Sequence, residues 1–376
     1  MGLGQVPQEV GVNLPWVLGE SAPNYQSYRK SLSILRQAGV RLFRVWAAPW
    51  EVPYGTTVDE YIARRSAHFR SLLEIAADLD SRLIVCLHTH VEFLDEKRAR
   101  DEIADVSLAW SSNTMNERCG GPLERPSDLF ANPELTASLG LQTFDDERLA
   151  SRCAAVELMN EVDLVPGYSR AAAVTWAQAI ACRLQSQNPN LAVTLSAADP
   201  WESVVLARRA GLSFASCHFH GWQGVSATTA LAGIRRFAVL SGVPLMFGEV
   251  STSSQKPPSP CQYGEWATLA LRAGSFSDSS VGLLWWVPEV IQDPQALGVL
   301  ANVLQQRVDA PFSRASRLIP RRFGALGVFR ALKLARRAVW DRRLRIRFLR
   351  RCAMAVLGWG SGITANEPEE RSPDDR

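Results

Sequence analysis

The sequence predicts an α/β fold, a (β/α)₈ TIM barrel, and three observations lead to it. Eight short apolar runs recur along the chain, and amphipathic segments lie between several of them. Continuous apolar runs that alternate with helices indicate a parallel sheet covered on both faces, and eight such units close a barrel. The 376 residues, 47% of them hydrophobic, suffice for a barrel of roughly 250–300 residues.

The expected strands and helices alternate in chain order. The strands are expected at residues 10–14, 40–46, 82–88, 154–160, 191–196, 214–219, 244–250 and 281–287. Helices are expected at residues 25–37, 62–80, 169–187, 201–210, 227–241, 264–273 and about 294–307. A doubly wound open sheet is the alternative fold, but it usually has fewer strands, and no glycine-rich phosphate loop follows the first run.

A long segment, roughly residues 91–153, separates the third and fourth expected strands. We interpret it as a loop region that shapes a substrate cleft, with a helix at about 145–153 leading into strand four, because long loops after barrel strands form active sites. The predicted organisation is a catalytic barrel over 1–308, a basic amphipathic helical extension over 309–352, and a polar tail of disordered composition over 353–376.

The charge is divided unevenly along the chain. Residues 312–352 carry 14 Arg or Lys against one acid, a net +13, so the rest of the chain sums to −10 for a total of +3. This pattern predicts either peripheral binding of the extension to an anionic membrane surface or its packing on the barrel helices. No nucleic-acid-binding motif accompanies it, so no nucleic-acid partner is expected.

The first residues lack a signal-peptide pattern, and no apolar run is long enough for a membrane span. A cytoplasmic or peripherally membrane-associated protein is therefore expected. The seven cysteines have no paired spacing, which favours reduced thiols over a disulfide framework.

Two carboxylates at expected strand ends are the strongest functional signal. Asn160-Glu161 ends the fourth strand, and Gly248-Glu249 ends the seventh. The carboxyl ends of barrel strands meet on one face, so the two glutamates can face each other. Glycoside hydrolysis needs such a pair, one to protonate the leaving oxygen and one to attack or to activate water. Taken singly, either glutamate could equally be a strand-end ion pair.

The neighbours of the pair also suit sugar chemistry. An arginine keeps a carboxylate ionised, a histidine can hydrogen-bond a hydroxyl or orient a glutamate, and a tryptophan can lie under a sugar ring. Four of the five histidines fall at two strand ends. The candidate substrate-binding residues at strand ends are Arg44, His88, His90, His218, His220, Trp285 and Trp286.

The segments FRVWAAPW, LHTH, ELMNEVDL, HFHGW, FGEVS and LLWWVPE resemble glycoside hydrolase clan A, and within it family 5, the cellulase- and mannanase-like enzymes and their little-characterised relatives. The resemblance covers roughly residues 9–308. It implies a retaining O-glycosyl hydrolase acting on β-linked oligo- or polysaccharide, with Glu161 as acid/base and Glu249 as nucleophile. It also implies that Asn160 contacts a sugar hydroxyl, and it requires no metal or organic cofactor.

Three further expectations concern the environment of these groups. Burial should raise the pKa of Glu161, Arg44 should keep Glu249 charged, and Glu157 should be a buried acid paired with a base such as Arg44. One position departs from the family pattern: His220 stands where the clan usually has a tyrosine that orients the nucleophile. Two alternatives remain open, a non-catalytic carbohydrate-binding relative and a metal-dependent barrel hydrolase using the two His-x-His pairs.

Overall fold

A computed structural model describes part of the chain in detail. The described residues are 10–14, 25–46, 57–93, 126–219, 233–234, 236–238, 240–250, 281–285 and 298. The predicted extension over 309–352 and the tail over 353–376 lie outside this part. The predicted helices over 264–273 and 294–307 lie outside it as well, except for the helical residue 298. None of the described helices is both long and apolar enough to cross a bilayer.

A single parallel sheet forms the centre of the described structure. Its strands are β1 (Val10–Asn13), β2 (Leu42–Trp46), β3 (Arg82–Cys86), β4 (Cys153–Glu157), β5 (Val193–Thr194), β6 (Ser196–Ala197), β7 (Ala215–Phe219), β8 (Leu245–Val250) and β9 (Val281–Trp285). Their order is β5-β4-β3-β2-β1-β9-β8-β7-β6. The first and last strands of this order are separated in sequence only by Leu195, so residues 193–197 pair with β4 on one side and β7 on the other. The sheet therefore runs round a barrel, as predicted.

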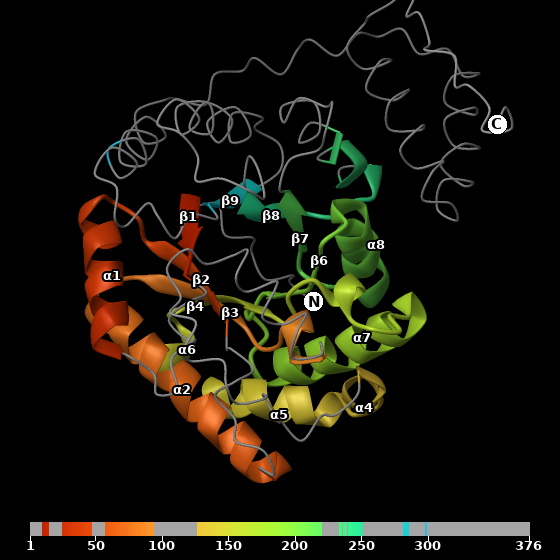
Figure 1. The fold of residues 1–376 in the computed structure, drawn as a ribbon, viewed down its shortest axis with the longest axis horizontal. Helices are drawn as coiled ribbons and strands as arrows, with labels where there is room; N and C mark the ends of the chain where they lie inside the picture. Colours follow the sequence, from red (N-terminus) through yellow and green to blue (C-terminus); the bar gives the residue numbers. More distant parts are fainter. Residues whose placement is uncertain are drawn as a thin grey trace, which may run out of the picture. The chain divides into compact units, whose positions relative to one another are not determined.

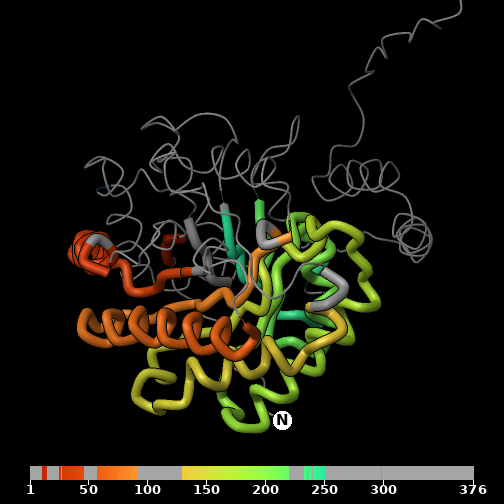
Figure 2. Tube along the Cα trace, turned by 60° about the horizontal axis from the view of Figure 1, so that its bottom comes forward, coloured from red at the N-terminus to blue at the C-terminus, as the bar shows by residue number. Residues whose placement is uncertain are grey.

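Helices lie outside the strands (Figure 1). They are α1 (Tyr25–Gln37), α2 (Val58–Asp78), α4 (Pro126–Ala131), α5 (Pro133–Thr143), α6 (Glu147–Ala150), α7 (Arg170–Gln187) and α8 (Pro200–Ala210), with short 3₁₀ turns η3 (His90–Phe93) and η4 (Val162–Leu164). Neighbours in this outer layer touch in the order α1, α2, α5, α7, α8. Figure 2 shows α2 in orange alongside α5 in yellow.

The interpretation of residues 91–153 as a loop region is wrong for 126–144. This stretch forms α4 and α5, and α5 packs between α2 and α7 as part of the outer layer. Asn132 caps α5 by accepting from the Leu135 amide, and Pro133 begins the helix. The predicted helix before strand four exists as the shorter α6. Residues 94–125 lie outside the described part.

The barrel core has two layers that follow from strand alternation. Along β2, Phe43 and Val45 belong to the large apolar cluster between the strands and the helices, whereas Leu42 belongs to a small separate cluster. The members of the small cluster lie in a strand or directly before one: Leu42 of β2, Ile84 of β3, Ala155 of β4, Ala192 before β5, Phe214 before β7 and Met246 of β8. Since side chains alternate in direction along a strand, Arg44, two residues after Leu42, faces the barrel interior one layer above this apolar floor.

Candidate active site

Arg44 is the centre of a buried polar network at the carboxyl ends of the strands. Its guanidinium donates to both carboxylate oxygens of Glu157 at 2.7 Å and to Glu249 Oε1 at 2.6 Å. It also donates to Asn13 Oδ1 at 3.0 Å and to Asn160 Oδ1 at 2.8 Å. Arg44 and Glu157 are fully buried, and Glu249 is 3% exposed. One cation thus holds two carboxylates from opposite parts of the barrel, and the expected pairing of Arg44 with Glu157 is confirmed.

The charge of Arg44 is fixed by these carboxylates. Burial acts to lower the pKa of the Arg44 guanidinium, but the negative charges of Glu157 and Glu249 and the hydrogen bonds to Glu157 raise it above its ordinary value. A permanently charged guanidinium 2.6 Å from Glu249 favours the ionised form of that carboxylate.

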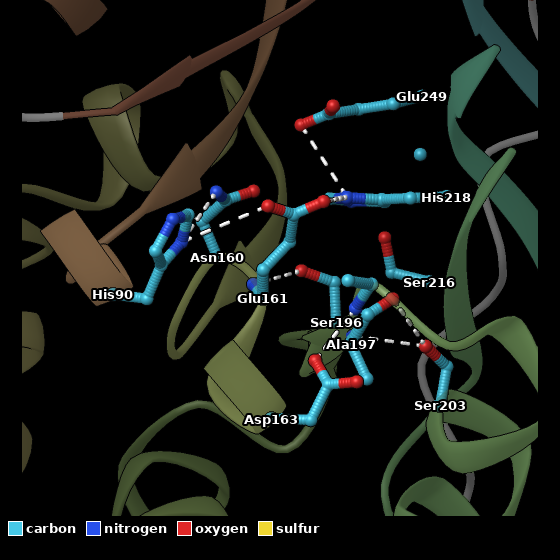
Figure 3. Close-up of polar contacts among 12 residues, drawn as sticks. His90, Asn160, Glu161, Asp163, Ser196, Ala197, Ser203, Ser216, His218 and Glu249 are labelled. Carbon is cyan, nitrogen blue, oxygen red and sulfur yellow. Dashed lines mark hydrogen bonds and ion pairs between the residues drawn. The ribbon is translucent and has the colours of Figure 1, made fainter. Parts of the chain in front are cut away.

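Glu161 lies beside Glu249 and is contacted by two histidines (Figure 3). His218 Nδ1 is 3.0 Å from Glu161 Oε1 and 3.5 Å from Glu249 Oε1, so the imidazole lies between the two carboxylates. His90 Nδ1 is 3.7 Å from Glu161 Oε2. One ligand-capable atom of each of Glu161, His218 and Glu249 lies within 4.8 Å of the other two. The two predicted catalytic glutamates are therefore brought together.

The expectation that burial raises the pKa of Glu161 is wrong in its net sign. Burial does act in that direction, but the hydrogen bond and positive charge of His218 and the charge of His90 outweigh burial and the repulsion from Glu249. The pKa of Glu161 is lowered from its ordinary value. The sequence placed the histidines at the right strand ends, but it could not show that His218 points at this carboxylate.

His88 is not brought to the carboxylates. Its Nδ1 faces the Tyr61 hydroxyl of α2 at 3.4 Å, and its Nε2 lies 2.9 Å from Thr136 Oγ1 of α5. The ring is fully buried between strand and helices. Strand β3 ends at Cys86, before His88, so His88 does not follow the alternation of inner and outer faces along the strand. Of the two predicted histidines in this segment, His90 takes the place at the site.

Three other predicted site residues have no described side chain. His220 and Trp286 lie outside the described residues, and Trp285 is described only as a backbone position at the end of β9. Asn160, by contrast, lies in the network, with its Nδ2 3.5 Å from His90 Nδ1 and its Oδ1 bound to Arg44.

Several site residues escaped the sequence analysis. Asn13 donates from Nδ2 to the Gly248 carbonyl at 2.9 Å and so ties β1 to the residue before Glu249. Ser216 of β7 lies 3.5 Å from Glu157 Oε2. Asn13 had a usable signal, since it is the single polar residue in an apolar run and falls at a strand end. Ser216 is an ordinary small residue, and its position had no comparable signal.

Gly248 is required by this packing, which gives a first prediction. A Cβ at this position would overlap Ser216 Oγ and lie 3.2 Å from His218 Nε2. We expect Gly248→Ala to lower the free energy of unfolding by about 1–3 kcal/mol, as overpacking does, and to reduce activity by displacing His218. Urea denaturation measures the first effect. Gly233→Ala is the matched control, because its Cβ would meet Trp201 at an ordinary 3.8 Å; equal stability of the two variants would contradict the prediction.

Known proteins resemble this chain in their three-dimensional structure, and the comparisons of sequence found no match. No protein-family model matches the chain, and no curated protein matches it in sequence. Among solved structures, it is similar to a β-1,4-mannanase from the sea hare Aplysia kurodai at 12% identity and a TM-score of 0.54, covering 81% of this chain and 94% of that one.

Two structures described as GH5_18 are also similar. The one from Streptomyces cattleya, in complex with GlcNAc, has 14% identity and a TM-score of 0.56 over 82% of both chains. The one from Bifidobacterium longum, in complex with Manb1-4GlcNAc, has 15% identity and a TM-score of 0.56 over 81% of this chain and 79% of that one. The chain therefore has the (β/α)₈ barrel fold of the family 5 glycoside hydrolases.

Proposed function

We propose that the chain is a retaining glycoside hydrolase that cleaves O-glycosidic bonds by double displacement. The observation that carries this proposal is the approach of Glu161 and Glu249 at the carboxyl ends of the strands, with oxygen atoms within 4.8 Å. Retaining enzymes hold their carboxyl groups about 5–5.5 Å apart, whereas inverting enzymes leave about 6.5–9.5 Å for a water molecule. The spacing supports direct attack by one carboxylate.

The environments of the two glutamates assign their roles. Glu249 lies against the Arg44 guanidinium, which keeps it ionised for attack on the anomeric carbon. As the bond to Glu249 forms, Glu161 gives its proton to the departing glycosidic oxygen. In the second step Glu161 takes a proton from water, whose oxygen attacks the anomeric carbon and releases the Glu249 carboxylate. The side chain of Glu161 is 14% exposed, more than that of Glu249 at 4%, which suits the group that exchanges protons with water.

The change of role of Glu161 follows from the charge of its neighbour. In the free enzyme the negative charge of Glu249 acts to raise the pKa of Glu161, against the larger lowering by His218. Esterification of Glu249 removes that negative charge, so the pKa of Glu161 falls further when the residue must act as a base. For the substrate we propose β-linked glucan or mannan oligosaccharides, supported by the fold shared with a β-1,4-mannanase.

Covalent trapping tests the proposal. Incubation with 2-deoxy-2-fluoro derivatives of activated β-mannosides and β-glucosides, followed by peptide mapping, should place one sugar on Glu249. Glu202, which is also buried but bound to Arg170, is the internal control and should stay unlabelled. Turnover with inversion at the anomeric carbon would contradict the retaining mechanism. Sugar binding without turnover of any substrate would favour a non-catalytic carbohydrate-binding protein.

A metal-dependent hydrolase is the competing function, because Glu161, His218 and Glu249 could also hold a metal ion. The Arg44 cation bound to Glu249 Oε1 opposes a second positive charge there. His88, turned toward Tyr61 and Thr136, does not share a ligand position with His90. Full activity after dialysis against a chelator supports the double displacement, and loss of activity restored by zinc would support the metal reaction instead.

The pH dependence gives a second prediction. Glu161 acts first in its protonated form, so its pKa sets the alkaline limb of kcat/KM. His218 lowers that pKa by its hydrogen bond and charge, so His218→Asn should raise it and move the alkaline limb to higher pH. His90→Asn is the matched control, with a smaller shift in the same direction, since His90 is the weaker influence. A limb that moves to lower pH in His218→Asn would contradict the assignment of Glu161 as the acid.

A third prediction concerns the basic segment, residues 312–352, which lies outside the described residues. We propose that its net +13 charge and interspersed apolar residues hold the protein at anionic membrane surfaces. The intact chain should pellet with phosphatidylserine-containing liposomes at low salt, and a chain ending at residue 311 should stay in the supernatant. Equal pelleting of the two chains would contradict the proposal; phosphatidylcholine liposomes are the control.

A further inference from the structure

The loop that carries Glu161 is fastened to the next segment of the barrel at two points. Ser196 of β6 accepts the Glu161 amide at 3.0 Å through Oγ, and the same hydroxyl donates to the Met159 carbonyl at 3.3 Å. Asp163 of η4 accepts the amides of Ala198 and Asp199 at 2.7 and 3.0 Å. We call residues 196–199 together with Asp163 the Asp163 clamp; Figure 3 shows Asp163 and Ser196 on the side of Glu161 away from Glu249.

Glu161 needs such a clamp because its backbone is in an unfavourable conformation. It has φ 50° and ψ 55°, the left-handed region, and only Asp80 shares a positive φ among the described residues other than glycine. A residue with a Cβ leaves this region unless its surroundings hold it there. Relaxation of the Glu161 backbone would swing its carboxylate away from His218 and Glu249.

The clamp is itself held by the start of α8. Ser203 exchanges hydrogen bonds with the backbone of Ala197, accepting its amide at 2.9 Å and donating to its carbonyl at 3.2 Å. The Asp199 carboxylate accepts the Trp201 amide at 2.9 Å and caps the helix. The two amides that bind Asp163 therefore belong to a segment fixed by a regular helix, which makes it a rigid anchor.

Asp163 is also electrostatically coupled to Glu161. Burial raises the pKa of Asp163, the amide hydrogen bonds lower it, and the negative charge of Glu161 raises it further, with the net result above its ordinary value. The Glu161 carboxylate is therefore close enough to Asp163 for its charge to act on the Asp163 pKa.

We propose that Asp163 is a positioning residue for the acid/base, which holds Glu161 in its left-handed conformation through the amides of Ala198 and Asp199. This inference rests on the proposed function, because it requires Glu161 to protonate the leaving group. Within the described residues the Asp163 carboxylate hydrogen-bonds the backbone amides of Ala198 and Asp199 and does not contact Glu249. Its effect should therefore appear in the protonation of the leaving group and not in the attack by Glu249.

Two aryl glycosides of one sugar separate these effects. A phenyl β-mannoside or β-glucoside releases phenolate, a poor leaving group that needs a proton from the acid. The 2,4-dinitrophenyl glycoside of the same sugar releases 2,4-dinitrophenolate, which leaves without protonation. We expect Asp163→Ala to lower kcat/KM for the phenyl glycoside by about 100-fold, the scale of a misplacement near 1 Å, with little change for the dinitrophenyl glycoside. Asp146→Ala is the matched control, because Asp146 also accepts two backbone amides, those of Arg148 and Leu149, at the start of α6. It should leave both substrates unchanged.

Two further variants test the clamp with smaller changes and guard against misfolding. Asp163→Asn leaves one acceptor oxygen for the two amides of Ala198 and Asp199, so it should lower phenyl glycoside turnover by less than Asp163→Ala does. Ser196→Ala weakens the clamp without a charge change, so it should lower phenyl glycoside turnover and leave the alkaline limb of kcat/KM in place. Equal losses on both glycosides, or no loss, in folded Asp163 variants would overturn the inference.

Glu161→Ala distinguishes failure of the inference from failure of the proposed function. If Glu161→Ala shows the leaving-group dependence and the Asp163 variants do not, only the positioning role is wrong. If Glu161→Ala itself lacks this dependence, Glu161 is not the acid and the proposed function is wrong.

Discussion

Glu249→Ala should lower kcat by at least about 10⁴-fold, because removal of the proposed covalent nucleophile leaves only binding and acid catalysis. Sodium azide should then restore cleavage of a 2,4-dinitrophenyl glycoside by occupying the space of the lost carboxylate, and the product should be the glycosyl azide of inverted configuration. Product analysis by NMR measures this outcome.

Glu161→Ala is the natural control for the azide experiment. There the nucleophile remains, so azide should attack the glycosyl–enzyme in place of water and give the glycosyl azide of retained configuration. Opposite configurations from the two variants would assign both roles independently of trapping. The same configuration from both would contradict the assignment.

Arg44→Met should destabilise the fold by about 3–5 kcal/mol, because it leaves the carboxylates of Glu157 and Glu249 buried without the cation that binds both. Urea denaturation of the full chain measures the loss. Arg29→Met is the control: Arg29 pairs with Asp78 at the surface, where both side chains are about half exposed, and its loss should be below about 1 kcal/mol.

A second substitution tests the physical cause of this loss. Adding Glu157→Gln to Arg44→Met removes one of the two uncompensated charges, so the double variant should be more stable than Arg44→Met alone. If the double variant is less stable, the Arg44 effect comes from lost packing of its side chain and not from the buried carboxylates.

Periodicity and strand-end position predicted much of the fold and of the site. The helix over 25–37 is present with the same limits, and Glu157, Asn160, Glu161, His218 and Glu249 lie at or just beyond the ends of strands whose apolar runs were recognised. This part was predictable because the carboxyl ends of barrel strands converge by topology, whatever the side-chain packing.

What escaped prediction depended on local chemistry that a pattern does not show. Helix α2 begins at Val58 and not at 62, because Thr57 and Glu60 form a capping box that lengthens the helix. Helix α5 was missed because its apolar periodicity is weak, and its position is set by packing between α2 and α7. His88 and His90 have the same spacing as two inner-face residues, and only the end of β3 at Cys86 separates their directions.

The Arg44 guanidinium binds two carboxylates with different consequences, Glu157 for the stability of the fold and Glu249 for the proposed reaction. The pair of Arg44 with Glu157 is a balanced buried ion pair contributed by β2 and β4 alone. The Glu249 carboxylate from β8 adds a further buried negative charge to a cation that is already matched. A neutral residue at 249 would suit the fold better than the glutamate that the chain keeps there. Screens that select only for heat resistance should therefore tend to eliminate Glu249, the proposed nucleophile, and engineering of this barrel needs a selection for turnover alongside one for melting temperature.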